Sequence, residues 1–414
     1  MSEVTSNFPQ LRFPDFDDKW EEKRLSDIAE KSNVKNRDNE VSSVFTNSAT
    51  KGVVNQRDFF DKDIANQNNL DGYYIINHDN FVYNPRISFS APVGPLNRNH
   101  LGTGVMSPLY TILKINNVSL DFIERYFKTT KWHRYMNNIA NIGARHDRMN
   151  IISSDFMKMP IPLPKDEEQQ KIAASLAAVD NKIEQLSKKQ ELLGEYKKGL
   201  MQQIFSQEIR FKADDGSDFP DWEEKKLGNI SNVSKLAGYE FTKYIKYQDT
   251  GSIIALRGLN IKKNKLDLSV VKFIDNSDFS RLNRSKLFID DLMFTYIGTI
   301  GEVALIDEDD KYYLAPNVSR IRFNNEVCLP RFAIQYFNRE VFKQGEIKKY
   351  VSSSSQPALT MGNVRLFILN LPTKPEQQKI ANFLSSIDSK IEQVGEQLDK
   401  SKQFKKALLQ KMFV

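Results

Sequence analysis

The chain has 414 residues, a formal net charge of +6 and a hydrophobic content of 40%, which excludes a mostly disordered protein and predicts two to three domains. Its single cysteine excludes an internal disulfide framework and a zinc site built from cysteines, and the charge is too small to indicate a partner. Without a secretory signal, or an apolar run near the roughly 18–20 residues that cross a bilayer, the chain is expected to be cytoplasmic, with no membrane partner.

The first half of the chain begins with the segment WEEKRLSDI, which Trp20 opens, and continues as a region of short β-rich runs. These runs are rich in β-branched and aromatic residues and are bounded by Gly, Pro, Asn or Asp, which is typical of strands separated by turns. Late in this region the sequence predicts a helical stretch over 120–135, and its counterpart in the second half is 330–346. Strands are expected at 73–77, 81–83, 109–113, 252–256, 292–296, 302–306 and 318–323.

The second half repeats the landmarks of the first. Trp222 opens WEEKKLGNI, and the segment EQQKIANFLSSIDSKIEQV at Glu376 matches EQQKIAASLAAVDNKIEQL at Glu168 in 12 of 19 positions. The intervening regions, 30–140 and 232–350, show no convincing register with each other. Two units of about 200 residues with similar ends and dissimilar middles favour a shared scaffold with two different variable surfaces. The alternative is an old duplication in which the sequences of the two middle regions diverged faster than those of the ends.

Each unit ends in a sequence with the heptad pattern of a coiled coil. Apolar residues recur at alternating steps of four and three, and the first such helix is expected over 166–206, about 60 Å long. Acidic residues at the helix starts, among them Glu168 and Glu376, are expected to complement the helix dipole. Tyr196 and Phe404 are expected to help cover the polar seam positions. The main seam residues are Ile172, Leu176, Val179, Ile183, Leu186, Ile380, Leu384, Ile387, Ile391 and Val394.

A helix with this apolar heptad face has to bury the face against another helix, and the chain contains two such helices. Intramolecular pairing is the economical solution, and homodimerisation is the alternative. Parallel pairing would require the roughly 16 residues at 207–222 to span most of the helix length, although they reach at most about 55 Å. Antiparallel pairing needs no such crossover. We therefore expect an antiparallel coiled coil with a pseudo-two-fold relation between the two halves.

Catalytic motifs are absent from the sequence. It contains no phosphate-binding P-loop, no glycine-rich AdoMet turn and no G-x-S-x-G elbow, and its four histidines lack metal-ligand spacing. Pro14-Asp15 with Glu21 and Lys23 fits a metal-dependent nuclease only superficially, because the acids are almost adjacent. We interpret this segment, and its counterpart near Trp222, as solvated polar residues around a packing tryptophan. The chain is expected to bind rather than to catalyse, with no catalytic residues, metal or cofactor.

Two variable regions that alternate with two near-identical helices beginning EEQQKIA and PEQQKIA resemble the specificity subunit of a type I restriction-modification enzyme. The resemblance covers essentially the whole chain, including the WEEK segments. It implies two target-recognition domains that read the halves of a bipartite, asymmetric double-stranded DNA sequence in a host-defence system. It also implies spacer helices that dock two modification subunits, and restriction subunits that act as translocase and nuclease. AdoMet, ATP and Mg²⁺ are then expected on those partner subunits.

The expected fold is α+β. Two target-recognition domains with twisted, mostly antiparallel sheets are joined and spaced by the two long helices of an intramolecular antiparallel coiled coil. The expected boundaries are 1–160 and 209–370 for the recognition domains, and 161–208 and 371–414 for the spacer helices.

Loop residues of the types that read base edges are the candidates for DNA contact. For each of them, a phosphate contact or a solvated loop position is at least as good an interpretation. The candidates are Arg86, Arg98, Asn99, Arg145, His146 and Arg148 in the first domain, and Arg257, Asn260, Tyr296, Thr299, Ser354 and Gln356 in the second.

Two other function classes stay open at this point. One is a structural coiled-coil adaptor whose two globular heads bind proteins. The other is a stand-alone nuclease, which predicts Mg²⁺-dependent DNA cleavage by the purified chain.

Overall fold

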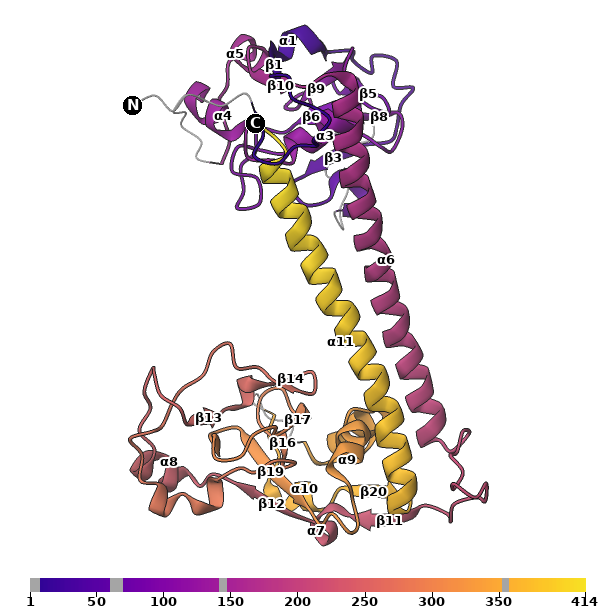
Figure 1. Ribbon diagram of the computed structural model, residues 1–414, viewed down its shortest axis with the longest axis vertical. Coiled ribbons are helices and arrows are strands. Elements are labelled where there is room, and N and C mark those ends of the chain that lie inside the picture. The colour runs from indigo at the N-terminus through magenta and orange to yellow at the C-terminus, as the bar shows by residue number, and fades with distance from the viewer. Residues whose placement is uncertain (1–7, 60–69, 141–146, 352–356) are drawn as a thin grey trace. The chain divides into compact units, whose positions relative to one another are not determined.

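The computed structural model describes residues 8–59, 70–140, 147–351 and 357–414, and the chain divides into two compact units. The first unit comprises residues 1–188 and 395–414, and the second comprises residues 189–394. Each unit therefore contains one globular region and parts of both long helices. The chain end, marked C in Figure 1, lies in the first unit, where Phe413 packs edge-on against Trp20.

The first unit is built around a four-stranded antiparallel sheet with the strand order β2-β9-β6-β7. Smaller antiparallel pairs, β1-β10, β3-β4 and β5-β8, surround this sheet. The strands are β1 (Glu21–Arg24), β2 (Ala29–Ser32), β3 (Phe45–Ser48), β4 (Gly52–Asn55), β5 (Tyr74–Ile76), β6 (Phe81–Tyr83), β7 (Leu96–Arg98), β8 (Gly104–Met106), β9 (Thr111–Ile115) and β10 (Pro160–Leu163). The helices are α1 (Leu25–Ile28), α2 (Gln56–Phe59), α3 (Leu120–Phe127), α4 (His133–Ile139), α5 (Ser153–Met157) and α6 (Asp166–Phe205).

The second unit has the corresponding sheet, with the order β12-β19-β16-β17 and antiparallel pairing throughout. Its smaller pairs are β11-β20, β14-β15 and the parallel pair β13-β18. The strands are β11 (Glu223–Lys226), β12 (Ser231–Lys235), β13 (Ile254–Leu256), β14 (Ile261–Lys262), β15 (Lys265–Leu266), β16 (Leu292–Thr295), β17 (Val303–Leu305), β18 (Tyr312–Leu314), β19 (Val318–Phe323) and β20 (Ile368–Leu371). The helices are α7 (Leu227–Ile230), α8 (Gly238–Tyr244), α9 (Pro330–Phe337), α10 (Met361–Arg365) and α11 (Lys374–Lys411), with short turns η1 (Gly258–Asn260), η2 (Phe279–Arg281), η3 (Asn283–Ser285), η4 (Phe342–Ile347) and η5 (Lys348–Tyr350).

The variable regions of the two units share a sheet arrangement that the sequence does not reveal. Both contain the same four-stranded sheet in the same strand order, although no register between 30–140 and 232–350 is visible in the sequence. What differs is the set of smaller strand pairs, since β13-β18 is parallel while β5-β8 is antiparallel. The seven predicted strands are all present, and the α+β, largely antiparallel fold is confirmed.

The predicted helical stretches over 120–135 and 330–346 are each interrupted. In the first, α3 ends at Phe127 and α4 begins at His133, because Thr129 between them bonds its own hydroxyl back to the Tyr126 carbonyl. In the second, Asn338 ends α9 and its side-chain amide donates to the Ile334 carbonyl. Side chains that compete for backbone groups thus end both helices early.

The repeated WEEK segment forms the first strand of each unit. β1 pairs with β10, and β11 pairs with β20 in the equivalent register. Trp20 is 2% exposed and packs against Phe122, while the strand side chains beside it face solvent, as expected for polar residues around a packing tryptophan. The β10 strand, which pairs with β1, runs from Pro160 to Leu163.

The start of each long helix carries an ion pair whose carboxylate is buried. The Glu168 carboxylate is 1% exposed and accepts two hydrogen bonds from the Arg12 guanidinium, at 2.8 and 2.7 Å. Glu376 is fully buried and accepts from Arg210 at 3.2 and 2.8 Å, and from the Trp222 indole at 3.2 Å. The main role of these two glutamates is therefore to tie the preceding chain onto the helix, beyond the dipole interaction expected from the sequence.

The glutamines that follow these glutamates hold the globular regions against the helices. Gln169 accepts from the backbone amide of Ser119 and donates to the Pro164 carbonyl. Gln377 does the same with the amide of Leu329 and the carbonyl of Pro372. Both side chains are buried, so the repeated Glu-Gln pair works as one structural connector in each unit.

The two long helices pair antiparallel in each unit (Figure 1). In the first unit, Asp180 of α6 pairs with Lys405 of α11, and the core beside them combines Leu176 with Leu408. In the second unit, Lys197 pairs with Asp388, and the core beside them includes Ile204, Phe205, Ile380 and Leu384. Residues nearer the start of α6 therefore contact residues nearer the end of α11, and residues nearer the end of α6 contact residues nearer the start of α11.

Every residue of the predicted heptad seam named above is buried or half-buried. The α6 helix ends at Phe205, one residue before the expected position. The expectation for Tyr196 and Phe404 is wrong, since these side chains are 56% and 57% exposed. The polar seam position Lys197 is instead satisfied by its ion pair with Asp388. Among the described residues, no helix is long and apolar enough to span a membrane.

Candidate nucleic-acid interface

The loop between β6 and β7 forms a tightly braced hairpin in the first unit. Its base is closed by a hydrogen bond from the amide of Asn84 to the carbonyl of Pro95, at 3.0 Å. The Tyr83 hydroxyl donates to the carbonyl of Val93 at 2.8 Å. Gly94 has φ +80°, and a side-chain carbon there would lie 2.2 Å from the Asn84 carbonyl oxygen. Only glycine fits this position, and the hairpin has one well-defined path.

Two of the predicted DNA contacts lie together at this hairpin. Arg86 and Arg148 face each other in a short antiparallel bridge, in which the amide of Ile87 donates to the Asp147 carbonyl and that of Met149 to the Pro85 carbonyl. Both guanidinium groups lie at the limit of ion-pair distance from Asp147, at 3.9 and 4.0 Å. One carboxylate therefore serves two cations, and the pair keeps a net positive charge.

A groove of about 350 Å³ opens beside these arginines. It is lined by Arg86, Arg148, the aromatic ring of Phe59 and polar side chains from several elements. These polar side chains are Thr46, Asn47, Ser48, Asn84, Ser88, Ser107 and Tyr110. The groove thus offers hydrogen-bond donors, acceptors and two cations on one surface, which are the groups that contact DNA bases and phosphates.

A buried amide network positions the β3 strand that forms one wall of the groove. The Asn47 amide donates to the carbonyls of Val82 and Pro95, at 2.7 and 3.1 Å, and accepts from Asn97 at 2.6 Å. The ammonium of Lys128 donates to Asn97 in turn, and burial lowers the pKa of Lys128. Asn47 lines the groove and Asn97 lies behind it, and both are almost fully buried, at 3% and 5% exposed, so this network fixes the position of the groove wall.

Arg98 and Asn99 have other surroundings. The Arg98 guanidinium is 12% exposed and forms ion pairs with Asp79 and Asp121, at 2.6 and 2.5 Å. Burial alone would lower the pKa of Arg98, but these two hydrogen-bonded carboxylates outweigh it and the pKa is raised. Asn99 is fully buried, and its amide donates to the carbonyls of Asn77 and Gly102. Because both side chains are engaged in holding the loop, we do not retain them in the proposed contact surface.

The second unit has an equivalent hairpin after β16, and it contains Tyr296 and Thr299. Ile297 bridges Ala358 here, as Arg86 bridges Arg148 in the first unit. Thr299 is exposed, and its carbonyl accepts from the Thr295 hydroxyl at 2.5 Å. Tyr296 is 6% exposed, and burial raises its pKa. The same scaffold therefore presents different side chains in the two units, and Thr299 is the accessible one of this predicted pair.

Arg257 and Asn260 lie together in a different loop of the second unit. The Arg257 guanidinium donates to the Val270 carbonyl at 3.0 Å, and the buried Asn260 amide donates to the carbonyls of Val270 and Asp267. Asn260 also accepts from the Arg257 amide at 3.1 Å. Asn260 is fully buried and shapes the loop, so Arg257 is the better contact candidate. Arg145, His146, Ser354 and Gln356 lie outside the described residues.

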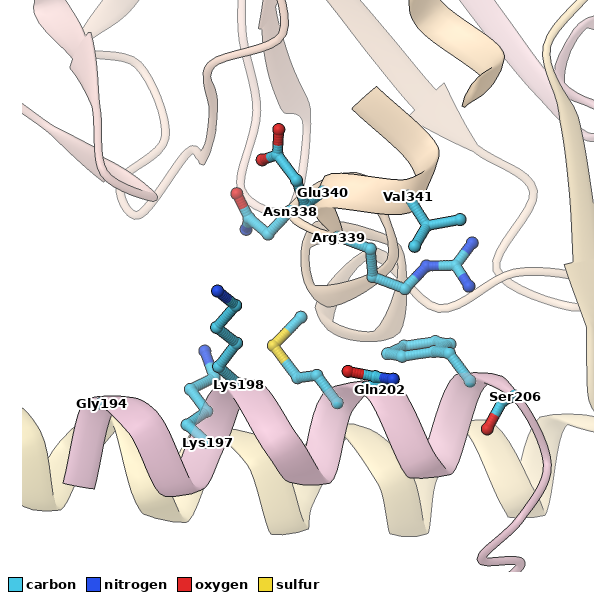
Figure 2. A pocket seen from close by; sticks show the side chains of 11 residues that line it. Gly194, Lys197, Lys198, Gln202, Ser206, Asn338, Arg339, Glu340 and Val341 are labelled. Atoms are coloured by element: carbon cyan, nitrogen blue, oxygen red, sulfur yellow. The ribbon is translucent and has the colours of Figure 1, made fainter. Parts of the chain in front are cut away.

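A second hollow of about 560 Å³ lies along the end of α6 in the second unit (Figure 2). Arg339 points over it from the segment after α9, and its guanidinium stacks 4.5 Å from the Phe205 ring centre and 3.6 Å from that of Tyr336. Its lining contains one acidic residue, Glu340, and no His or Cys. Elsewhere in the described part of the chain, no group of three or more His, Cys, Asp or Glu is arranged to hold a metal.

Comparison with known families identifies the class of protein. Residues 17–193 and 220–400 each match the family model described as "Type I restriction modification DNA specificity domain". These matches cover most of the chain, and the protein belongs to this family. It is thus a specificity subunit of the type I restriction-modification class, which does not itself carry catalytic activity.

Individual relatives agree with this assignment. The MjaVIII type I restriction enzyme specificity subunit of Methanocaldococcus jannaschii is 28% identical over 315 residues, which cover 72% of each chain. The EcoBI specificity subunit of Escherichia coli is 22% identical over 317 residues, covering 70% of this chain and 66% of that one. The crystal structure of a type I restriction-modification S subunit from M. genitalium matches 98% of this chain with a TM-score of 0.57 at 13% identity, and covers 99% of its own chain. At that identity, the structural match supports the fold alone.

Proposed function

We propose that this chain reads a bipartite, asymmetric sequence in double-stranded DNA and directs modification and restriction subunits to it. The observation that carries the proposal is one sheet scaffold occurring twice with different loop side chains. Where the first unit places Arg86 and Arg148, the second places Ile297 and Ala358. Two binding surfaces of unlike chemistry favour two unlike half-sites, since base recognition depends on the donors and acceptors presented.

The side chains of the first unit suit direct contact with DNA. Arg86 is 68% exposed, so its guanidinium is free to turn toward a guanine edge or a phosphate. Arg148 is 31% exposed and lines the same groove, which keeps a second cation beside the first. In the second unit, Arg257 and Thr299 are the described candidates for the corresponding contacts.

We infer the partner subunits of this chain from the family to which it belongs. The two long helices expose one face along much of their length, and we propose that two modification subunits dock there. AdoMet would then be held by the modification subunits, and ATP and Mg²⁺ by the restriction subunits, in the cytoplasm.

Replacing Arg86 by Ala should relax recognition at the first half-site and leave the second half-site intact. A well-placed arginine–guanine contact discriminates by about 1–3 kcal/mol, roughly 5- to 150-fold between bases. The measurement is methylation mapping of DNA from cells that carry the variant with its modification subunit. Arg257→Ala should relax the other half-site in the same way.

The exposed Arg24 on β1 provides a matched control, because Arg24→Ala removes the same charge from a position that belongs to neither the hairpin nor the lining of its groove. Its methylation motif should be unchanged. Equal loss of recognition at both half-sites in Arg86→Ala would contradict the assignment of the first unit to one half-site.

A further inference from the structure

Phe89 is the most exposed large hydrophobic side chain among the described residues. It is 104% exposed, compared with 77% for Val341 and 63% for Tyr239. The ring therefore gains nothing from packing within the chain, although transferring a phenylalanine side chain out of water is worth about 1.5–3 kcal/mol. A side chain held this far into solvent is suited to burial against a ligand.

The backbone holds Phe89 at the tip of a closed turn. Phe89 and Ser90 are the two central residues between Ser88 and Ala91, whose backbone groups exchange hydrogen bonds at 3.0 and 3.1 Å. The Ser88 hydroxyl accepts a further bond from the Ala91 amide, also at 3.1 Å. Below this turn, Val93 is fully buried and Ala91 is 7% exposed, which fixes the return arm to the domain. A rigid turn lowers the entropy cost of inserting the ring into a ligand.

The surroundings of the ring favour DNA over a protein surface. Its chain neighbours are the polar residues Ser88 and Ser90, whereas the centre of a protein interface is typically a cluster of apolar side chains. At the base of the same hairpin lie Arg86 and Arg148, which can neutralise phosphates on either side of a distorted base step. An apolar wedge beside cations is the combination that unstacks and kinks a duplex.

We propose that Phe89 inserts between two base pairs of the DNA at the first half-site and stacks on the bases it separates. This inference rests on the proposed function, since it requires that the first unit binds DNA. The equivalent hairpin of the second unit carries Gly298 and Thr299 and has no aromatic residue over 297–301, so the wedge acts at one half-site alone. The step that it opens is expected to be a flexible pyrimidine–purine step, because TA and CA/TG unstack most easily.

The test uses the chain assembled with its modification subunit and a duplex carrying its mapped target sequence. 2-Aminopurine, whose fluorescence rises when it unstacks, replaces an adenine at each step of the first half-site in turn, and one in the second half-site. Wild-type complex should raise the emission at one step of the first half-site. Phe89→Ala should abolish that rise and weaken DNA binding roughly 5- to 150-fold, the range for one lost base–aromatic stack.

Two further variants distinguish the effect of losing the aromatic ring from the effect of altering the turn. Phe89→Trp should preserve the fluorescence rise, because a larger aromatic ring can still stack. Ser90→Ala alters the same turn without removing the ring and should behave as wild type. Since Phe89 has no packing contacts to lose, the thermal unfolding of Phe89→Ala should match that of the wild-type chain.

Each contrary outcome has a distinct meaning. If wild-type complex binds the target tightly while Phe89→Ala changes neither affinity nor fluorescence, the wedge is wrong and the proposed function stands. If Phe89→Ala prevents assembly with the modification subunit, the ring contacts protein and the wedge is again wrong. If the wild-type complex binds no DNA, the proposed function itself fails.

Discussion

Replacing Glu376 by Gln should lower the free energy of unfolding of the second unit by about 3 kcal/mol. Glu376 is fully buried and is the common acceptor for Arg210 and Trp222. Removing one partner of a buried ion pair typically costs about 3–5 kcal/mol, because the other charge stays without compensation. The Arg210 side chain is 24% exposed and can recover some hydration, so the lower end of that range is expected.

The measurement is hydrogen exchange along α11, where amides of the first turns should exchange faster in Glu376→Gln. Glu392→Gln is the matched control on the same helix, since the Glu392 side chain is 52% exposed and pairs with Lys265 at the surface. Such an exposed pair contributes at most about 1 kcal/mol. Equal effects of the two substitutions would contradict the structural role of Glu376. Glu168→Gln should produce the corresponding loss in the first unit.

Replacing Leu384 by Ala should destabilise the second unit by about 2–5 kcal/mol. Leu384 is fully buried, and its side chain belongs to the core that combines α6, α11 and the globular region. A leucine truncated in such a core loses its transfer free energy and leaves a cavity behind. Denaturant unfolding, followed by circular dichroism, should show a lower midpoint.

Leu192→Ala provides the comparison for Leu384→Ala. Leu192 lies on α6 outside the seam and is 51% exposed, so its truncation should change the free energy of unfolding by less than about 0.5 kcal/mol. The pair therefore tests the heptad assignment itself. A larger loss at Leu192 than at Leu384 would mean that the seam runs along a different face of the helices.

Features of the fold that depend on local patterns could be predicted from the sequence. The heptad spacing of α6 and α11 repeats within each helix, and the β-rich runs lie between turn residues, so both are visible without tertiary information. The shared four-stranded sheet was not visible, because a strand fits its place through burial and alternation, and many different side chains satisfy both. The Arg12–Glu168 pair joins residues 156 positions apart and leaves no local signal.

The sequence predicts the region of the candidate site better than it predicts which residues of that region are available for contact. Arg86 and Arg148 are of a residue type that reads base edges, and the structure brings them together at one hairpin. Asn99 and Asn260 belong to the same residue types, yet both are buried and bond to backbone groups of their own loops. The sequence does not identify Phe89 as a candidate contact, since an aromatic residue between serines gives no sign of whether it is packed or exposed.

Methylation mapping of DNA from cells carrying this chain with its modification subunit tests directly whether the chain reads two half-sites. We expect one bipartite motif, with two different half-sites separated by a spacer of fixed length. Exchanging residues 209–370 for the matching region of a relative should change one half-site and keep the other. A single continuous motif, a palindrome of two equal half-sites, or no motif at all would contradict the proposed reading of a bipartite, asymmetric target.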